Sequence, residues 1–126
     1  LASLNSARRK SRDARRVADI KQIQLALELY FDAAVGGSPN YTATLSSLAP
    51  TYIPAVPADP LGGAYAFFKC SKTSYHIGAS LEESGNVALS NDRDSASLCV
   101  GDTVNGTDTG KCAAADQGAY CYDLSP

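Results

Sequence analysis

Apolar residues recur at helical spacing in the first third of the chain. Residues 3–34 contain no Gly or Pro and are rich in Ala, Arg, Leu, Gln and Lys, which favour helix. This composition predicts a helix of about 30 residues. Gly36 and Gly37 are expected to end it in a left-handed cap, with Pro39 close behind. The second half of the helix carries a stripe that needs a partner surface, formed by Val17, Ile20, Ile23, Leu27, Tyr30, Phe31 and Ala34.

The first half of the same helix has a different character. Its apolar residues are small ones, Ala7, Ala14 and Ala18, and they lie among arginines. The C-terminal half is therefore expected to pack on the rest of the chain. The N-terminal half is expected to project without an intramolecular partner.

The segment from residue 38 to residue 60 holds five of the six prolines, too many for a strand ladder or a long helix. We expect a loop that packs on the rest of the chain, with one short turn capped by Thr44 and running through Leu48. Six apolar side chains would seat this loop, namely Tyr41, Leu45, Leu48, Tyr52, Ile53 and Val56.

Strand-like patterns follow in the second half. Residues 64–70 and 74–82, separated by three residues, predict a β-hairpin, and residues 119–124 predict a last short strand. The stretch between them is rich in turn-forming residues and is expected to be loop. The predicted fold class is α+β, with a long N-terminal helix packed on a small antiparallel sheet. One domain of residues 1–126 would comprise a helix (1–35), a connecting loop (36–63) and a head (64–126) with a crosslinked loop.

Charge is strongly segregated along the chain. Residues 8–21 contain seven basic and two acidic side chains, a net charge of +5, whereas everything after Lys21 has four basic and eleven acidic ones, a net charge of −7. No run of about 18 apolar residues indicates a membrane span. The chain thus presents one basic helical surface and one acidic surface.

All four cysteines, Cys70, Cys99, Cys112 and Cys121, lie in the second half, and no pair has CxxC spacing. An even number in a small polar domain predicts two disulfides and an oxidising compartment, with reduced thiols in the cytosol as the alternative. Three pairings are open. We favour Cys70 with Cys121 and Cys99 with Cys112, because this nested arrangement would tie the last strand to an early one.

Carboxylates gather in the predicted crosslinked loop, at Asp92, Asp94, Asp102, Asp108 and Asp116. Calcium needs such oxygen ligands, so the sequence predicts a calcium site with Asp92, Asp94 and Asp108 as the first candidates. The pattern does not match an EF-hand, since Asp92-Arg93-Asp94 lacks the following ligand and glycine. Alternatively, these carboxylates only keep a loop soluble, and the disulfides order it without an ion. No other cofactor is expected.

Enzymatic chemistry finds little support in the sequence. His76 is the only histidine, it falls in a predicted strand, and no Ser or Cys accompanies it in a recognisable motif. Gly62-Gly63 follows Asp59-Pro60 and is typical of a turn rather than a nucleotide loop. The sequence therefore predicts a protein that is not an enzyme, with a structural or surface histidine.

Four stretches together cover well over half of the chain and resemble a known family: SARRKSRDARRVADIKQIQLALELYFD, TLSSLAPTYIPAVPADPLGGAYAF, YHIGASLEESGNVAL and YDLSP. They are similar to the type IV pilin superfamily, especially the major pseudopilin of type II secretion and related bacterial type IV pilins. That family begins with a leader and an apolar helix that carries a glutamate. The resemblance implies that this segment would directly precede Leu1 and is absent from the given sequence.

The resemblance implies a structural function. Such a subunit is held in the inner membrane by its N-terminal segment, and an assembly machinery then polymerises it with copies of itself and minor pilins. The product is an extracytoplasmic or cell-surface filament of the bacterial envelope, either a secretion pseudopilus or an adhesive, motility or DNA-uptake pilus. The family's major pseudopilins also bind calcium in a loop before the last strand.

Two hypotheses concern the basic helix. In the filament hypothesis, arginines of one subunit meet carboxylates of its neighbours, whereas in the simpler reading they only solvate a helix leaving a membrane. The predicted interface residues are Arg8, Arg9, Arg12, Arg15, Arg16 and Glu28. The rival hypothesis is nucleic-acid binding through Arg8 to Lys21, but the helix lacks a helix-turn-helix or zipper pattern. Weak DNA adsorption by an assembled filament is a further option.

Overall fold

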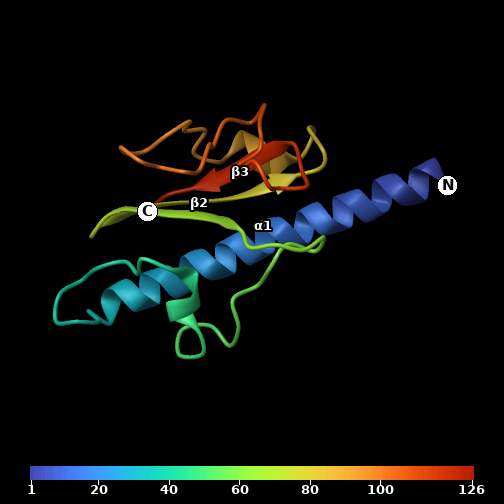
Figure 1. The fold of residues 1–126 in the computed structure, drawn as a ribbon. Coiled ribbons are helices and arrows are strands. Elements are labelled where there is room, and N and C mark those ends of the chain that lie inside the picture. Colours follow the sequence, from blue (N-terminus) through green and yellow to red (C-terminus); the bar gives the residue numbers. More distant parts are fainter.

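The computed structural model describes residues 1–126, and its elements follow the predicted order of helix, loop, hairpin, loop and strand (Figure 1). The fold class is α+β, as predicted. The elements are α1 (Ala2–Asp32), the 3₁₀ turn η1 (Leu45–Leu48), β1 (Ala66–Ser71), β2 (Ser74–Leu81), the 3₁₀ turn η2 (Val87–Ser90) and β3 (Tyr120–Leu124).

The three strands form one antiparallel sheet in the order β1-β2-β3. Lys72 and Thr73 lie between β1 and β2, so the predicted hairpin is confirmed. Gly78 at the middle of β2 lies opposite Ala66 of β1 and Asp123 of β3. The central strand is therefore paired along both edges, and the predicted last strand closes the sheet.

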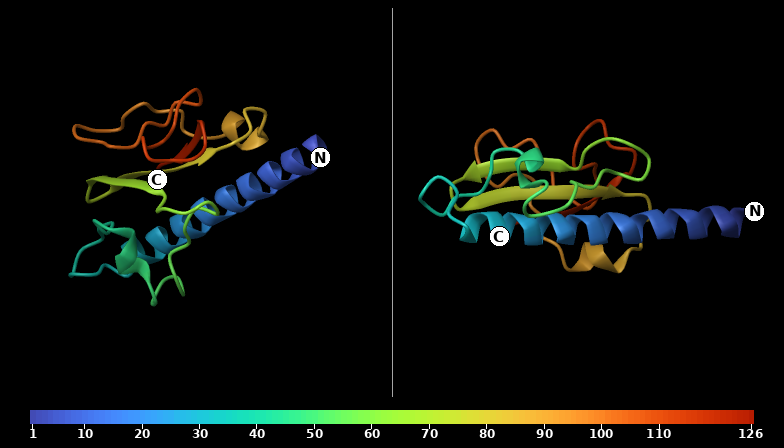
Figure 2. Two further views of the ribbon diagram at one scale, coloured as in Figure 1. Left: turned by 45° about the vertical axis from the view of Figure 1, so that its right-hand side comes forward. Right: turned by 90° about the horizontal axis from the view of Figure 1, so that it is seen from below.

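Helix α1 runs along one face of the sheet and extends past its end (Figure 1). In the right-hand view of Figure 2 the strands lie alongside the C-terminal part of α1, while its first turns project beyond them. The connecting loop, with η1, covers the other side of the C-terminal half of α1. The half of the helix with the apolar stripe thus packs on the rest of the chain, while Leu25 and Leu29 on its outer face stay exposed.

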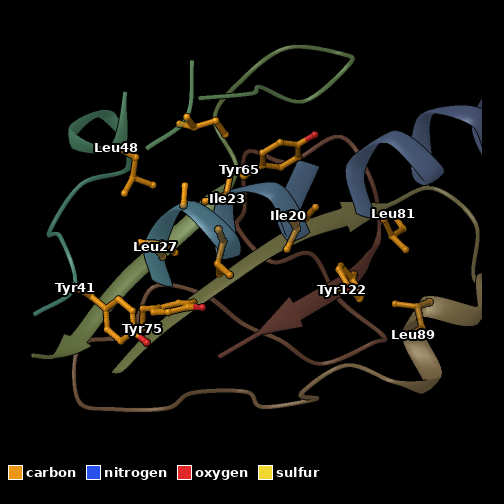
Figure 3. Packing of buried hydrophobic residues seen from close by; sticks show 14 residues of the cluster. Ile20, Ile23, Leu27, Tyr41, Leu48, Tyr65, Tyr75, Leu81, Leu89 and Tyr122 are labelled. Carbon is orange, nitrogen blue, oxygen red and sulfur yellow. The ribbon is translucent and has the colours of Figure 1, made fainter. Parts of the chain in front are cut away.

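The alternating pattern of β2 divides its side chains between two different layers. Tyr75, Ile77, Ala79 and Leu81 belong to a cluster of 14 buried apolar residues that also includes residues of α1 (Figure 3). Ile20, Ile23 and Leu27 of α1 have no exposed surface in this cluster. Burying each such side chain contributes about 1.5–3 kcal/mol, so this apolar layer holds the helix on the sheet.

On the other face of β2 lie His76, Gly78 and Ser80, which are covered by the loop between η2 and β3 (Figure 1). A side chain at Gly78 would collide with the sulfur of Cys112, because its Cβ would lie only 2.6 Å away. A small second cluster of Val104, Cys112 and Cys121 lies on this side. We call this side, from residue 91 to residue 118 with the polar face of β2, the crosslinked layer.

Three local predictions were wrong. Ala34, with a φ of +49°, is the first left-handed residue after α1, so the helix ends before the glycines, and Gly36 and Gly37 only continue the turn. Thr44 precedes η1 but makes no capping hydrogen bond to the backbone, since its hydroxyl bonds those of Ser46 and Ser47. The turn η2 occurs in a stretch predicted to be loop.

No helix of the structure combines the length and apolar character needed to cross a membrane.

Candidate functional site

A network of ion pairs fastens the basic half of α1 to the rest of the chain. Its centre is Arg16, whose side chain has no exposed surface. The guanidinium donates two hydrogen bonds to the Asp59 carboxylate, at 2.7 and 2.9 Å, and others to Asp13 and Glu82. This fork geometry is the arrangement in which arginine binds carboxylates most strongly.

The remaining members join α1 to the end of β2. The buried carboxylate of Asp13 accepts hydrogen bonds from the backbone N–H groups of Glu82 and Glu83. Arg12 donates two hydrogen bonds to Glu82, at 2.7 and 2.8 Å, and Arg9 pairs with Glu83. We call this network the helix clamp; its members are Arg9, Arg12, Asp13, Arg16, Asp59, Glu82 and Glu83.

The helix clamp shifts the pKa values of Glu82 and Arg16. Hydrogen bonds from Arg12 and Arg16 lower the pKa of Glu82 to about 2, although burial alone would raise it. Burial alone would likewise lower the pKa of Arg16, but its bonds to Asp59, Glu82 and Asp13 outweigh that effect and raise it. These groups therefore stay charged across the physiological pH range.

The helix clamp overturns the expectation that the basic half of α1 has no intramolecular partner. The C-terminal end of β2 and the turn at Asp59 lie beside the basic half of α1, and their carboxylates pair with its arginines.

The predicted interface residues are largely occupied within the chain. Arg9, Arg12 and Arg16 bind carboxylates of their own chain. Arg15 lies near Asp19 and the carbonyl oxygen of Ala58. Two interface residues remain: Arg8 is exposed and makes no ion pair, and Glu28 accepts hydrogen bonds from Tyr41 and Tyr75.

The four cysteines form two disulfides, as predicted, but the predicted pairing of Cys70 with Cys121 and Cys99 with Cys112 is wrong. Cys70 is bonded to Cys99 and Cys112 to Cys121, with Cα–Cα distances of 5.7 and 4.9 Å. The predicted bond from Cys70 to Cys121 is excluded by the sheet order, because β1 and β3 flank β2 and lie about 9–10 Å apart. That separation exceeds the span of a disulfide.

The three predicted calcium ligands come together. Asp92, Asp94 and Asp108 each offer a carboxylate oxygen within 4.8 Å of the others, and we call them the acidic cluster. One buried oxygen of Asp92 and one of Asp108 have no hydrogen-bond partner. The other two acidic residues of this loop lie elsewhere, since Asp102 bonds His76 and Asp116 bonds Ser80.

The electrostatics of the acidic cluster are unfavourable without a cation. Burial and the nearby carboxylates of Asp108 and Asp123 raise the pKa of Asp92 to about 7. Burial and neighbouring Asp94 also raise the pKa of Asp108. Unpartnered buried carboxylate oxygens that repel one another are the donor set that a hard divalent cation would satisfy, and Ca²⁺ prefers such ligands. The residues therefore fit a calcium ion.

Asp123 of β3 holds the backbone that carries this cluster. Its buried carboxylate accepts hydrogen bonds from the N–H groups of Asp94 and Ser95, and its own N–H donates to Asp92. Asp123 was not among the site residues predicted from the sequence. The available signal was its strand position, two residues from Cys121 and so on the face of β3 that meets the crosslinked layer.

His76 lies beneath Asp123 and has no exposed side-chain surface. Its two ring nitrogens each lie 2.7 Å from a carboxylate oxygen, Nδ1 from Asp102 and Nε2 from Asp123. The side chains of both aspartates are also fully buried. Of the two predicted alternatives, a structural or a surface histidine, the buried position excludes the surface one. Nothing in the local sequence could reveal the two carboxylate partners of His76.

Comparisons of the chain with known protein families, with curated proteins and with solved structures find no match.

Proposed function

We propose that this protein is a structural subunit of an extracytoplasmic filament of the type IV pilin kind, polymerising through α1. The observation that carries this proposal is the free end of the helix. No residue before Arg9 makes a side-chain hydrogen bond or ion pair, and Leu1 and Leu4 are 99% and 49% exposed. Two disulfides suggest an oxidising, extracytoplasmic environment and agree with this role.

A filament requires a contact between two different surfaces, repeated by one operator. Four basic side chains of α1 remain exposed for such a contact, namely Arg8, Lys10, Arg15 and Lys21. The head with its net acidic charge offers a surface of opposite sign. A basic helix end that meets the acidic face of the next copy would repeat without closing, because the two surfaces lie on different parts of the molecule.

The helix clamp weakens the nucleic-acid alternative. Four of the seven basic residues between Arg8 and Lys21 form ion pairs with carboxylates of their own chain, namely Arg9, Arg12, Arg15 and Arg16. Phosphate binding would have to displace these pairs, while the acidic head repels the polyanion. The filament proposal instead uses only the basic residues that are still exposed.

Charge reversal on the free end tests the filament proposal. We expect the Arg8→Glu, Lys10→Glu double variant to self-associate less than the wild type in sedimentation velocity at about 0.05 M salt, where charges interact over longer distances. The matched control is Lys111→Glu, an exposed change in the crosslinked layer. Arg16 is unsuitable, because its replacement would disrupt the helix clamp. Equal self-association of the double variant and the wild type would contradict the proposal.

The gene sequence just before Leu1 provides an independent test. The proposal expects a leader followed by about 20 apolar residues that include a glutamate. A polar segment at that place would contradict membrane-held assembly.

We also propose that the acidic cluster binds Ca²⁺ and orders the crosslinked layer. The specific observation is the pair of buried, unpartnered oxygens on Asp92 and Asp108. Calorimetric titration with calcium should show one site in the wild type and none in Asp108→Asn. The matched control is Asp32→Asn, an exposed acid on α1. Undiminished binding by Asp108→Asn would place the site elsewhere, and no binding by the wild type would overturn it.

A further inference from the structure

His76 is the only basic side chain hydrogen-bonded within a group of five carboxylates, of which all but that of exposed Asp94 are buried or half-buried. The group comprises Asp92, Asp94, Asp102, Asp108 and Asp123. The charged or titratable groups that face His76 are Asp102 from the crosslinked loop and Asp123 from β3. On β1, its neighbour across the ladder is Phe68, which does not titrate.

With both neighbouring carboxylates charged, the geometry at His76 calls for a proton on each ring nitrogen. A neutral imidazole donates from one nitrogen only, whereas an imidazolium donates from both. Both nitrogens of His76 lie 2.7 Å from ionisable carboxylates, and a carboxylate can only accept when it is charged. Burial alone would lower the pKa of His76, but the hydrogen bonds to Asp123 and Asp102 raise it.

Asp123 links this imidazolium to the acidic cluster. The oxygen that faces His76 also accepts from the Ser95 N–H, and the other oxygen accepts from the Asp94 N–H at 2.9 Å. The main chain of Asp123 also holds this loop, because its carbonyl oxygen accepts from the Arg93 N–H and its N–H donates to Asp92. The loop that carries Asp92 and Asp94 is thus fixed to one residue, and His76 fixes the side chain of that residue.

We propose that His76 is a positioning residue for the acidic cluster, acting through Asp123, and that it must carry both ring protons to keep the cluster ready for calcium. This inference rests on the calcium site proposed above and adds its regulation. When His76 loses a proton, either Asp102 or Asp123 loses one donor and becomes a buried anion without a counter-charge, bonded only by backbone N–H groups. Such a group costs free energy, so the layer must rearrange to hydrate it.

The expected consequence is a loss of calcium affinity at alkaline pH. Removing a hydrogen-bond partner that orients metal ligands typically lowers metal affinity about 10- to 100-fold. Ionisation of the ligands acts in the opposite direction, because the pKa of Asp92 is about 7 and rising pH by itself would strengthen calcium binding. If the calcium affinity falls over the same pH interval in which His76 loses a ring proton, His76 positions the calcium ligands. A histidine that only stabilises the fold would not give this match.

The test uses the full chain and calcium alone as the probe. Calorimetry gives the calcium Kd over a pH series from about 6 to about 10, and ¹⁵N NMR of the single histidine reports its ring protons over the same series. We expect both ring nitrogens to be protonated at neutral pH. The Kd should rise at least about tenfold over the interval in which one proton is lost.

Two variants keep the test decisive if the wild-type ring does not titrate in this range. Asp102→Asn removes one of the two carboxylates, so the imidazolium should lose its proton at lower pH and the fall in affinity should move with it. The matched control, Asp116→Asn, changes an acid of the same layer that bonds Ser80 and not His76. In this control, calcium affinity should fall at the same pH as in the wild type.

The outcomes separate the two proposals. A wild type that binds no calcium at any pH overturns the calcium site and the positioning role together. A wild type that binds calcium, but whose Kd ignores the ring proton in both wild type and Asp102→Asn, overturns the positioning role alone. A ring with only one proton at neutral pH also overturns it.

Discussion

The two faces of β2 are stabilised by different physical means. Toward α1, the strand buries Tyr75, Ile77 and Leu81 in an apolar cluster that contains no disulfide. Toward the crosslinked layer, it presents His76 and Ser80 to aspartates, and both disulfides lie on that side. Alternate side chains of residues 75–81 thus face two different layers. Apolar burial stabilises the layer on the α1 side, and hydrogen-bonded aspartates and disulfides stabilise the other.

The difference teaches how a short chain can build a second layer. The crosslinked layer is nearly all loop, and its own apolar cluster has only three buried members. A loop of this kind cannot offset its conformational entropy by burial alone, so crosslinks and fixed charges must contribute. Changes to the crosslinks, to the aspartates of the crosslinked layer or to calcium should therefore affect one face of β2, and removal of apolar volume the other.

Reduction of the disulfides should have the largest effect. Loss of a native disulfide from a small domain costs about 2–5 kcal/mol, and the crosslinked layer contains both bonds. We expect a lower urea midpoint after treatment with a dithiol, with amide exchange accelerating first between residues 91 and 118. If amide exchange after reduction accelerated more in α1 than in residues 91–118, the claim that the disulfides stabilise the crosslinked layer most would be contradicted.

Removing apolar volume from the opposite face should cost nearly as much. Ile77→Ala leaves a cavity beneath α1 and should lower the free energy of unfolding by about 2–5 kcal/mol. Because the change touches no charged group, its cost should be the same with and without calcium, within about 0.5 kcal/mol. A cost that depends strongly on calcium would show that the two faces are coupled.

The apolar face could be predicted from the sequence, and the charged face largely could not. Period-2 and helical spacing reveal which residues of β2 and α1 are apolar, and these patterns are local. His76 meets Asp102 and Asp123 only because the sheet order and a crosslinked loop bring positions 26 and 47 residues away together. The disulfide pairing failed for the same reason, since it depends on which strand lies in the centre.

The acidic cluster was predictable and the helix clamp was not. Aspartates at 92, 94 and 108 lie in one loop, so the sequence indicated that they could meet, although it grouped them with Asp102 and Asp116, which lie elsewhere. Arg16 is separated from Asp59 by 43 residues and from Glu82 by 66, and its spacing is that of any solvated arginine on a helix. Only the packing of the apolar stripe, which sets the axial position of α1, decides which carboxylates it meets.

Acid should weaken the helix clamp by a smaller amount. The pKa of Glu82 is about 2 in the folded protein against an ordinary value near 4.5, so the folded state binds fewer protons between these values. The resulting stabilisation is complete above pH 4.5 and is lost as the pH falls toward about 2. In urea unfolding, Glu82→Gln should be less stable than the wild type at neutral pH and should lose less stability on acidification. Parallel pH profiles would contradict this role of Glu82.

The central claim is that the crosslinked layer is built to hold a cation, and calcium-dependent unfolding of the wild type tests it most directly. Calcium that binds only the folded state should raise its free energy of unfolding by about 2.7 kcal/mol at about 100 times the Kd. Thermal unfolding of the full chain in calcium and in a chelator, at pH 7, provides the measurement. The account predicts a higher midpoint in calcium, lost in Asp108→Asn. An unchanged wild-type midpoint at millimolar calcium would contradict it.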